Sequence, residues 1–111
     1  MENQENQEKK TLRCNRANSI INNFANALLK LSVDCPEFSN AIDIIRDCQS
    51  NNGKVITTGL GKAGIVMRKF SATLCSLGVP SCYLHPGEAN HGDLGIISSN
   101  DILFVASCKL C

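Results

Sequence analysis

The feature that most constrains this chain is a strand–loop–helix unit between Lys54 and Leu77. Its strand, 54–58, is short and rich in β-branched residues, as is typical of a strand buried on both faces of a parallel sheet. The loop, 59–62, begins the motif 59–64, which reads GLGKAG and has the form G-x-G-x-x-G between a strand and a helix. Glycines allow close backbone approach, and the free N–H groups of a helix start favour an anion. The unit predicts an anion-binding turn, with a purely structural tight turn as the alternative.

The flanking segments extend this unit into a larger α/β fold. Apolar spacing predicts helices at 18–31, 37–50 and 63–77 and strands at 54–58, 80–84 and 101–107. Pro36 separates the first two helices, and Gly78 ends the third. In the third helix, the expected apolar face consists of Val66, Phe70, Thr73, Leu74 and Leu77. Strand, helix and strand with short connections form a right-handed βαβ unit, so the sheet is expected to be parallel.

Composition limits the classes of function. The chain has 111 residues, enough for one domain, and a net charge of +1, which offers no basic face for nucleic acid. No apolar run approaches the ~20 residues of a membrane span, and the polar residues 1–10 lack the apolar stretch of a secretory signal. We therefore expect a cytoplasmic protein with a flexible polar N-terminus, 1–15, and one domain over 16–111.

The cysteines do not suggest a disulfide framework. There are seven, at irregular spacing, and the one suggestive pair is Cys108-x-x-Cys111. A zinc site there needs two further ligands in tetrahedral geometry, so a chance pair is the preferred interpretation. We expect no metal and no organic cofactor; the sequence leaves open a metal at the two histidines His85 and His91.

Two nucleotide-binding interpretations of the glycine-rich loop are disfavoured. A dinucleotide fold needs an acidic residue at the end of its second strand, but here that strand runs into His85. A P-loop needs four residues before Gly-Lys-Ser/Thr, which the loop does not have. Lys62 adds a positive charge within the turn. A small phosphorylated or otherwise anionic substrate suits this arrangement better.

A second polar segment follows the second predicted strand. Residues 85–95 read HPGEANHGDLG, with two histidines, two carboxylates and an asparagine among three glycines. It lies beyond the carboxyl end of a strand, where open α/β sheets bind ligands. Titratable groups on such a loop favour a binding or catalytic role, with a solvated turn as the alternative.

Together these segments resemble the arabinose 5-phosphate isomerases of the sugar isomerase (SIS) domain family. The resemblance rests on GLGKAG after a strand, on Arg68-Lys69 and Ala72-Thr73-Leu74 in the helix, and on HPGEANHGDLG. It covers about 53–105. It implies an SIS-type three-layer α-β-α sandwich, incomplete here, with two leading helices and about three strands of a parallel sheet.

The resemblance also implies a reaction and a set of site residues. The reaction is the reversible isomerisation of ribulose 5-phosphate and arabinose 5-phosphate through an enediolate, a step that supplies Kdo for lipopolysaccharide. Lys62 matches the active-site lysine and would stabilise substrate oxygens. The substrate-binding residues would be Gly61, Lys62, Ala63, Glu88, His91 and Ser107. His85 and Asp93 are expected to shape the loop.

The sequence departs from the family pattern after the third predicted strand. Ser107 corresponds to the first residue of the family's serine-rich phosphate loop, and the rest of that loop is replaced by Cys108 and the residues after it. The family's catalytic glutamates and a further histidine have no counterpart. We expect a truncated domain without isomerase activity of its own, from a family whose members form homo-oligomers. The alternative is a non-catalytic SIS-type module that binds a sugar phosphate.

Overall fold

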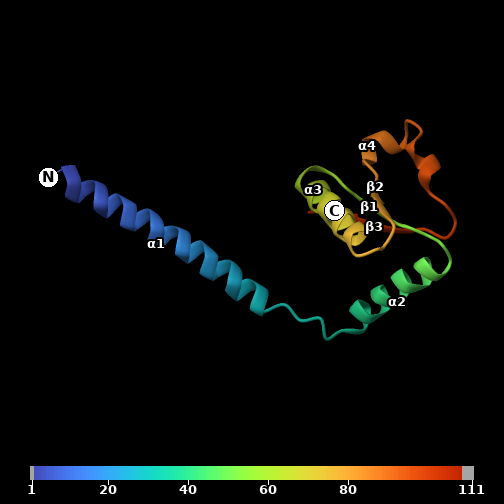
Figure 1. Ribbon diagram of the computed structural model, residues 1–111, viewed down its shortest axis with the longest axis horizontal. Helices are drawn as coiled ribbons and strands as arrows, with labels where there is room; N and C mark the ends of the chain where they lie inside the picture. Colours follow the sequence, from blue (N-terminus) through green and yellow to red (C-terminus); the bar gives the residue numbers. More distant parts are fainter. Residues whose placement is uncertain (1, 109–111) are drawn as a thin grey trace. The chain divides into compact units, whose positions relative to one another are not determined.

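The computed structural model describes residues 2–108, and its contacts divide the chain into two units at Cys35 and Pro36. The first unit is one long helix, α1 (Glu2–Leu29) (Figure 1). The sequence placed the start of this helix at Asn18 and expected a frayed segment over residues 1–10, which is wrong from Glu2 onward. Glutamate, glutamine and lysine favour a helix even where the segment has no apolar face. Within this segment Lys9 Nζ lies 2.6 Å from Glu5 Oε1, one turn away.

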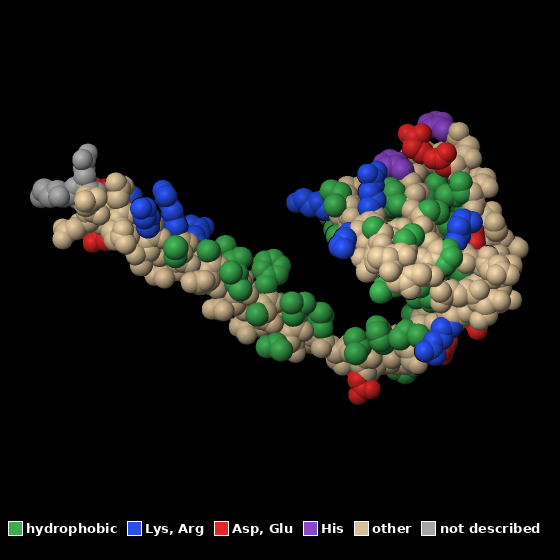
Figure 2. Space-filling model, in the orientation of Figure 1, with side chains coloured by type: hydrophobic (Ala, Val, Ile, Leu, Met, Phe, Trp, Pro, Cys, Tyr) green, Lys and Arg blue, Asp and Glu red, His purple; other side chains and the backbone are tan. Residues whose placement is uncertain are grey.

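The apolar side of α1 is uncovered within its own unit. Side chains at helical spacing remain half or more exposed, namely Ile20, Ile21, Phe24 and Leu28. Figure 2 shows apolar side chains along this helix. The domain boundary expected after residue 15 stays a prediction. The contacts of the chain divide it into two units between Cys35 and Pro36. None of the helices within residues 2–108 is long and apolar enough to cross a membrane.

The second unit is an α/β layer, and its class agrees with the prediction. Its elements are α2 (Pro36–Ser50), β1 (Val55–Gly59), α3 (Gly61–Ser76), β2 (Ser81–Tyr83), α4 (Pro86–Ala89), the short 3₁₀ helix η1 (Asp93–Ile96) and β3 (Ile102–Ala106). The three strands form a parallel sheet in the order β2-β1-β3. The central strand carries the core, because Val55, Ile56 and Thr57 are fully buried. The expected α/β class with two leading helices and three parallel strands is confirmed.

Helix α3 packs on one face of this sheet through part of the predicted apolar face and through small residues that were not predicted. The buried positions are Gly64, Ser71 and Leu74, whereas Val66 and Leu77 are 60% and 74% exposed. The helix backbone lies close to the strands: Thr57 Oγ1 donates a hydrogen bond to the carbonyl oxygen of Met67 at 2.9 Å. Such close approach admits small side chains such as Gly64 and Ser71, which apolar periodicity does not identify. The predicted apolar face is confirmed at Leu74 and is wrong at Val66 and Leu77.

The other face of the sheet is open along β3. Phe104 faces α3, where its ring meets that of Phe70 edge-to-face with centroids 5.4 Å apart. Leu103 and Val105 point the opposite way because side chains alternate along a strand, and they are 53% and 67% exposed. Buried parallel sheets are normally covered on both faces. The second helical layer of a complete sandwich is therefore missing over β3 among the described residues.

One ion pair fastens the amino ends of the strands. The carboxylate of Asp101, with a side chain only 3% exposed, accepts hydrogen bonds from Lys54 N at 2.8 Å, Lys54 Nζ at 2.6 Å and Ser98 N at 2.7 Å. These bonds lower the pKa of Asp101 to about 2, the Lys54 side chain being the largest cause. The pair joins the residue before β1 to the residue before β3. It lies at the opposite end of the strands from the carboxyl edge, where the glycine-rich turn follows β1 and the 85–95 segment follows β2.

Candidate functional site

The sheet brings the three polar segments of the sequence to one edge. Thr57 pairs with Tyr83, and Gly59 pairs with Ala106, so the three parallel strands end side by side. The glycine-rich turn follows β1, the 85–95 loop follows β2, and Ser107 follows β3. The carboxyl edge of a parallel sheet is where α/β proteins bind their ligands. The segments singled out from the sequence are thus neighbours in the fold.

The glycine-rich turn leads directly into α3 without a capping side chain. The helix starts at Gly61, two residues earlier than expected, and its N-cap residue, Leu60, accepts no hydrogen bond through its side chain. The N–H groups of the first turn therefore remain available to an anion, which the helix dipole also favours. Gly61 has φ of +60°, a left-handed conformation that a residue with a Cβ adopts at a cost. Lys62, in this first turn, is exposed to solvent.

Gly64 has a different role from Gly61. A Cβ at Gly64 would overlap the carbonyl oxygen of Gly59 and lie 2.8 Å from Tyr83 Oη. The absence of a side chain lets α3 approach the end of β1 at backbone distance. The two outer glycines of the motif, Gly59 and Gly64, therefore fix the position of the helix start, and the middle one fixes its backbone conformation.

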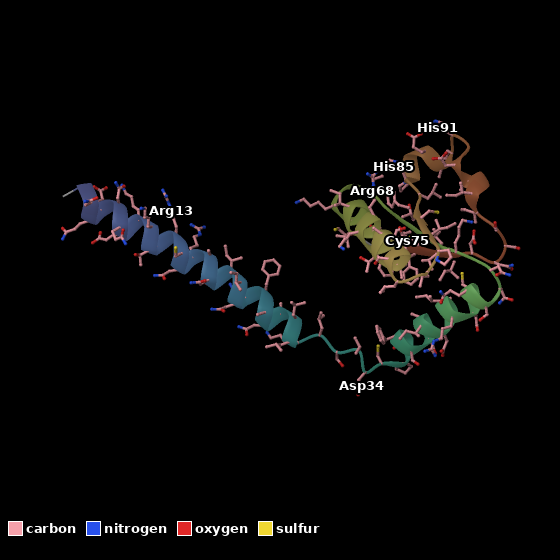
Figure 3. The ribbon with its side chains drawn as sticks, in the orientation of Figure 1. Arg13, Asp34, Arg68, Cys75, His85 and His91 are labelled. Atoms are coloured by element: carbon pink, nitrogen blue, oxygen red, sulfur yellow. The ribbon has the colours of Figure 1, made fainter. Side chains whose placement is uncertain are left out.

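The 85–95 segment contains two short helical turns, α4 and η1, where the sequence predicted a loop. His85 is the N-cap of α4: its Nδ1 accepts a hydrogen bond from Gly87 N at 3.0 Å. This agrees with a loop-shaping role for His85. His91 Nδ1 lies 3.9 Å from Glu88 Oε2, and these side chains are 77% and 64% exposed. The loop thus presents an imidazole and a carboxylate together to solvent (Figure 3).

The role of His85 can be tested without ligand. We expect His85→Ala to remove the acceptor for the Gly87 N–H and to accelerate hydrogen exchange of that amide, because the first turn of α4 loses its cap. Because α4 is exposed and peripheral, the Tm of the whole unit should stay almost unchanged. Amide exchange followed by NMR checks the first statement, and thermal unfolding checks the second. An unchanged exchange rate at Gly87 would show that the imidazole does not hold this turn.

The other predicted site residues stay predictions as ligands. Gly61, Lys62 and Ala63 lie together at the start of α3, Glu88 and His91 lie on the neighbouring loop, and Ser107 lies just beyond β3. Asp93 begins η1 and is exposed. Within residues 2–108 no group of three or more histidine, cysteine or acidic side chains could hold a metal ion. Cys108 is exposed, and Cys111 of the predicted pair lies outside the described residues.

The sequence interpretation missed two residues that contact the site elements. Tyr83, the last residue of β2, donates a hydrogen bond to the carbonyl oxygen of Gly59 at 2.5 Å. The guanidinium carbon of Arg68 lies 4.7 Å from the centre of the Tyr83 ring. An aromatic residue two positions before the first histidine of the 85–95 loop was the available signal. Its significance depended on knowing that β2 lies beside β1.

The arrangement is that of the phosphosugar isomerases with solved structures. A phosphosugar isomerase assigned to capsule formation in Bacteroides fragilis superposes with a TM-score of 0.81 at 36% identity, over 86% of this chain and 50% of that one. An Escherichia coli CFT073 protein in complex with arabinose 5-phosphate superposes with a TM-score of 0.76 at 37% identity, over 87% of this chain and 50% of the other. The chain therefore has the fold of one half of an SIS-type phosphosugar isomerase.

Within this class the chain is homologous to the arabinose 5-phosphate isomerases. It is 44% identical to the enzyme KdsD of Francisella tularensis over 79 residues, which are 71% of this chain and 24% of the relative. An uncharacterized protein of Rickettsia prowazekii is also 44% identical, over 82% of this chain and 28% of its own length. The chain thus spans about a quarter of these curated relatives and half of the solved structures. No protein-family model matches it.

Proposed function

We propose that this chain provides the anion-binding half of a phosphosugar isomerase site and binds a five-carbon sugar phosphate at the carboxyl edge of its sheet. The observation that carries the proposal is the uncapped start of α3 beside the 85–95 loop. Homology to arabinose 5-phosphate isomerases makes arabinose 5-phosphate and ribulose 5-phosphate the expected ligands. The arabinose 5-phosphate found with the Escherichia coli relative supports this class of ligand.

The geometry suggests a division of roles within the site. The N–H groups of Gly61 and Ala63 and the ammonium of Lys62 offer donors and positive charge to substrate oxygens. Glu88 and His91 can hydrogen-bond sugar hydroxyls, and Ser107 can contribute a hydroxyl from the end of β3. In an aldose–ketose isomerisation, a base moves a proton between C1 and C2 while a cation stabilises the enediolate oxygen. Lys62 is suited to this electrostatic part.

Proton transfer by this chain alone is the weaker possibility. The carboxylate of Glu88 and the imidazole of His91 are mostly exposed to water, whereas general acids and bases are usually tuned by burial. Further residues would have to cover this loop before its groups acquire such properties. We therefore propose that the chain binds the sugar phosphate without isomerising it, and that isomerase activity belongs to a complete domain. The non-catalytic binding module is therefore the proposed function, and isomerase activity of the chain itself is the second candidate.

The test of ligand binding centres on Lys62. Ribulose 5-phosphate is titrated into the ¹⁵N-labelled chain, with ribulose as the ligand that lacks the phosphate. We expect Lys62→Ala to weaken binding about tenfold or more, because one charge-assisted contact is lost. Lys69→Ala is the matched control, since it removes the same charge from the same helix at a side chain that donates to Thr73 Oγ1 instead. Equal binding by the two variants would exclude Lys62 from the site.

A coupled assay separates the two candidate functions. Purified chain is supplied with ribulose 5-phosphate, and arabinose 5-phosphate is measured. Product formation that Lys62→Ala abolishes would establish an isomerase and overturn the binding-only proposal. Binding without turnover supports the module. As a member of the arabinose 5-phosphate isomerase lineage, the complete protein is proposed to act in the cytoplasm, in Kdo and lipopolysaccharide precursor supply, as a homo-oligomer.

A further inference from the structure

Tyr83 lies between the two polar segments at the carboxyl edge of the sheet, the glycine-rich turn after β1 and the 85–95 loop after β2. It is the last residue of β2 and stands two residues before His85, the first residue of the 85–95 loop. Its hydroxyl crosses to the neighbouring strand and donates to the carbonyl oxygen of Gly59, the last residue of β1, at 2.5 Å. Because Gly59 begins the glycine-rich turn, this bond links the start of the turn to the strand from which the 85–95 loop continues. Beside it, Thr58 Oγ1 donates to the carbonyl oxygen of Leu84 at 2.6 Å.

The same hydroxyl also faces the helix. A Cβ on Gly64 would come within 2.8 Å of Tyr83 Oη, so the phenol lies against the first turn of α3. The ring also lies against Arg68, whose guanidinium carbon is 4.7 Å from the ring centre, a distance at which a cation and an aromatic face attract. Tyr83 is therefore packed between the end of β1, the start of α3 and an arginine further along that helix.

The loop is joined to this group through His85. The His85 ring meets the Tyr83 ring edge-on, with centroids 6.4 Å apart. The imidazole also caps α4 through the Gly87 N–H, so its position sets the first turn of the helix that carries Glu88. Figure 3 shows Arg68 and His85 on the same side of the unit, below His91. A continuous set of contacts thus runs from the glycine-rich turn to the exposed carboxylate.

We propose that Tyr83 is a positioning residue that fixes the glycine-rich turn relative to the 85–95 loop, so that both can contact one sugar phosphate. The inference rests on the proposed function. A phosphate at the start of α3 and hydroxyls near Glu88 belong to one small molecule, so their separation has to be held within a fraction of an ångström. Tyr83 acts through its neighbours and does not itself contact the ligand.

The chain provides a matched control on the same strand. Ser81, two residues before Tyr83, donates from its hydroxyl to the carbonyl oxygen of Val55 at 2.7 Å. Both side chains therefore join β2 to a carbonyl of β1, Ser81 at the amino end and Tyr83 at the carboxyl end. If the phenol only stabilises the sheet, Tyr83→Phe and Ser81→Ala should have the same kinds of effect.

The experiment compares these two variants in the full chain, with ribulose 5-phosphate as the probe. Both should lower the Tm modestly. Tyr83→Phe should weaken binding roughly fivefold, whereas Ser81→Ala should bind as the wild type does. In the free protein, Tyr83→Phe should shift the amide resonances of both Lys62 and Glu88, and Ser81→Ala should shift neither. Arg68→Met, which leaves the hydroxyl bond in place, should give smaller effects in the same direction.

The outcomes separate this inference from the proposed function. If the wild-type chain does not bind ribulose 5-phosphate, the proposed function fails, and the amide shifts of the ligand-free variants still decide whether Tyr83 couples the two segments. If the wild type binds and Tyr83→Phe binds equally well, the positioning role is overturned. The same holds if Ser81→Ala weakens binding as much as Tyr83→Phe does. Should Tyr83→Phe not fold, unchanged affinity and unchanged amide shifts in Arg68→Met would overturn it.

Discussion

Gly64→Ala is expected to destabilise the second unit by about 3 kcal/mol, enough to abolish cooperative unfolding of so small a core. The new methyl group would overlap the carbonyl oxygen of Gly59 and press on Tyr83 Oη. Neither neighbour can move away easily: the carbonyl belongs to the central strand, and the phenol is held by a hydrogen bond and a cation. The helix would have to move away from the sheet. Thermal and urea unfolding followed by circular dichroism measure the loss.

Two other glycines serve as controls for this substitution. At Gly61 there is open space for a Cβ, but φ is +60°, so Gly61→Ala should cost about 1 kcal/mol through backbone strain alone. At Gly95 there is open space and no positive φ, so Gly95→Ala should stay within about 0.5 kcal/mol of the wild type. If Gly64→Ala were as stable as Gly95→Ala, α3 could not lie as close to β1 as the structure has it.

Asp101→Asn is expected to produce the second large effect, at the opposite end of the sheet. The substitution removes the charge that faces Lys54 Nζ and replaces one acceptor oxygen by a donor, so at least one N–H group of Lys54 or Ser98 loses its partner. Because these bonds join the entry of β1 to the entry of β3, the strand pairing itself weakens. We expect a clearly lower urea midpoint than for Asp47→Asn, which alters an exposed carboxylate on α2.

The lowered pKa of Asp101 predicts how the stability of the fold depends on pH in the acid range. This pKa is lowered from 3.8 to about 2 in the folded chain, so the unfolded state binds the proton more readily. The stabilisation is fully present above about pH 4 and is lost as the pH falls toward about 2. The urea midpoint of the wild type should therefore fall across this window, and that of Asp101→Asn should fall less. If the urea midpoints of the two proteins fell equally between about pH 4 and about pH 2, Asp101 would be excluded as the group responsible.

The uncovered face of β3 explains why the stability margin is expected to be small. Leu103 and Val105 remain largely in water, and the largest fully buried side chains among residues 2–108 lie on the central strand. The solved relatives contain as much chain again beyond the matched half. Since apolar burial is the main favourable term in folding, a sheet with an open face along one strand has a smaller surplus of stability with which to tolerate a lost contact.

Local pattern in the sequence was sufficient for much of the architecture. The β-branched strand before a glycine-rich turn, the proline between the helices and the βαβ order predicted a parallel α/β fold, which the structure and the homology confirm. These signals work because strand and helix periods, turn glycines and proline act over a few neighbouring residues. The prediction of a frayed end over residues 1–10 was wrong, because α1 begins at Glu2. The first residues of this helix lack an apolar face, but their helix propensity is high.

What the sequence determined by itself was the inventory of the proposed site: Lys62 in a glycine-rich turn that is predicted to bind an anion, and a polar loop with Glu88 and His91. Only the tertiary structure decided which residues hold these segments together. The contacts of Tyr83 with Gly59, Arg68 and His85, and the ion pair of Lys54 with Asp101, join residues from separate strands and helices. No local pattern encodes such pairs, because they depend on strand order and on the close approach of α3, which small residues at Gly64 and Ser71 permit.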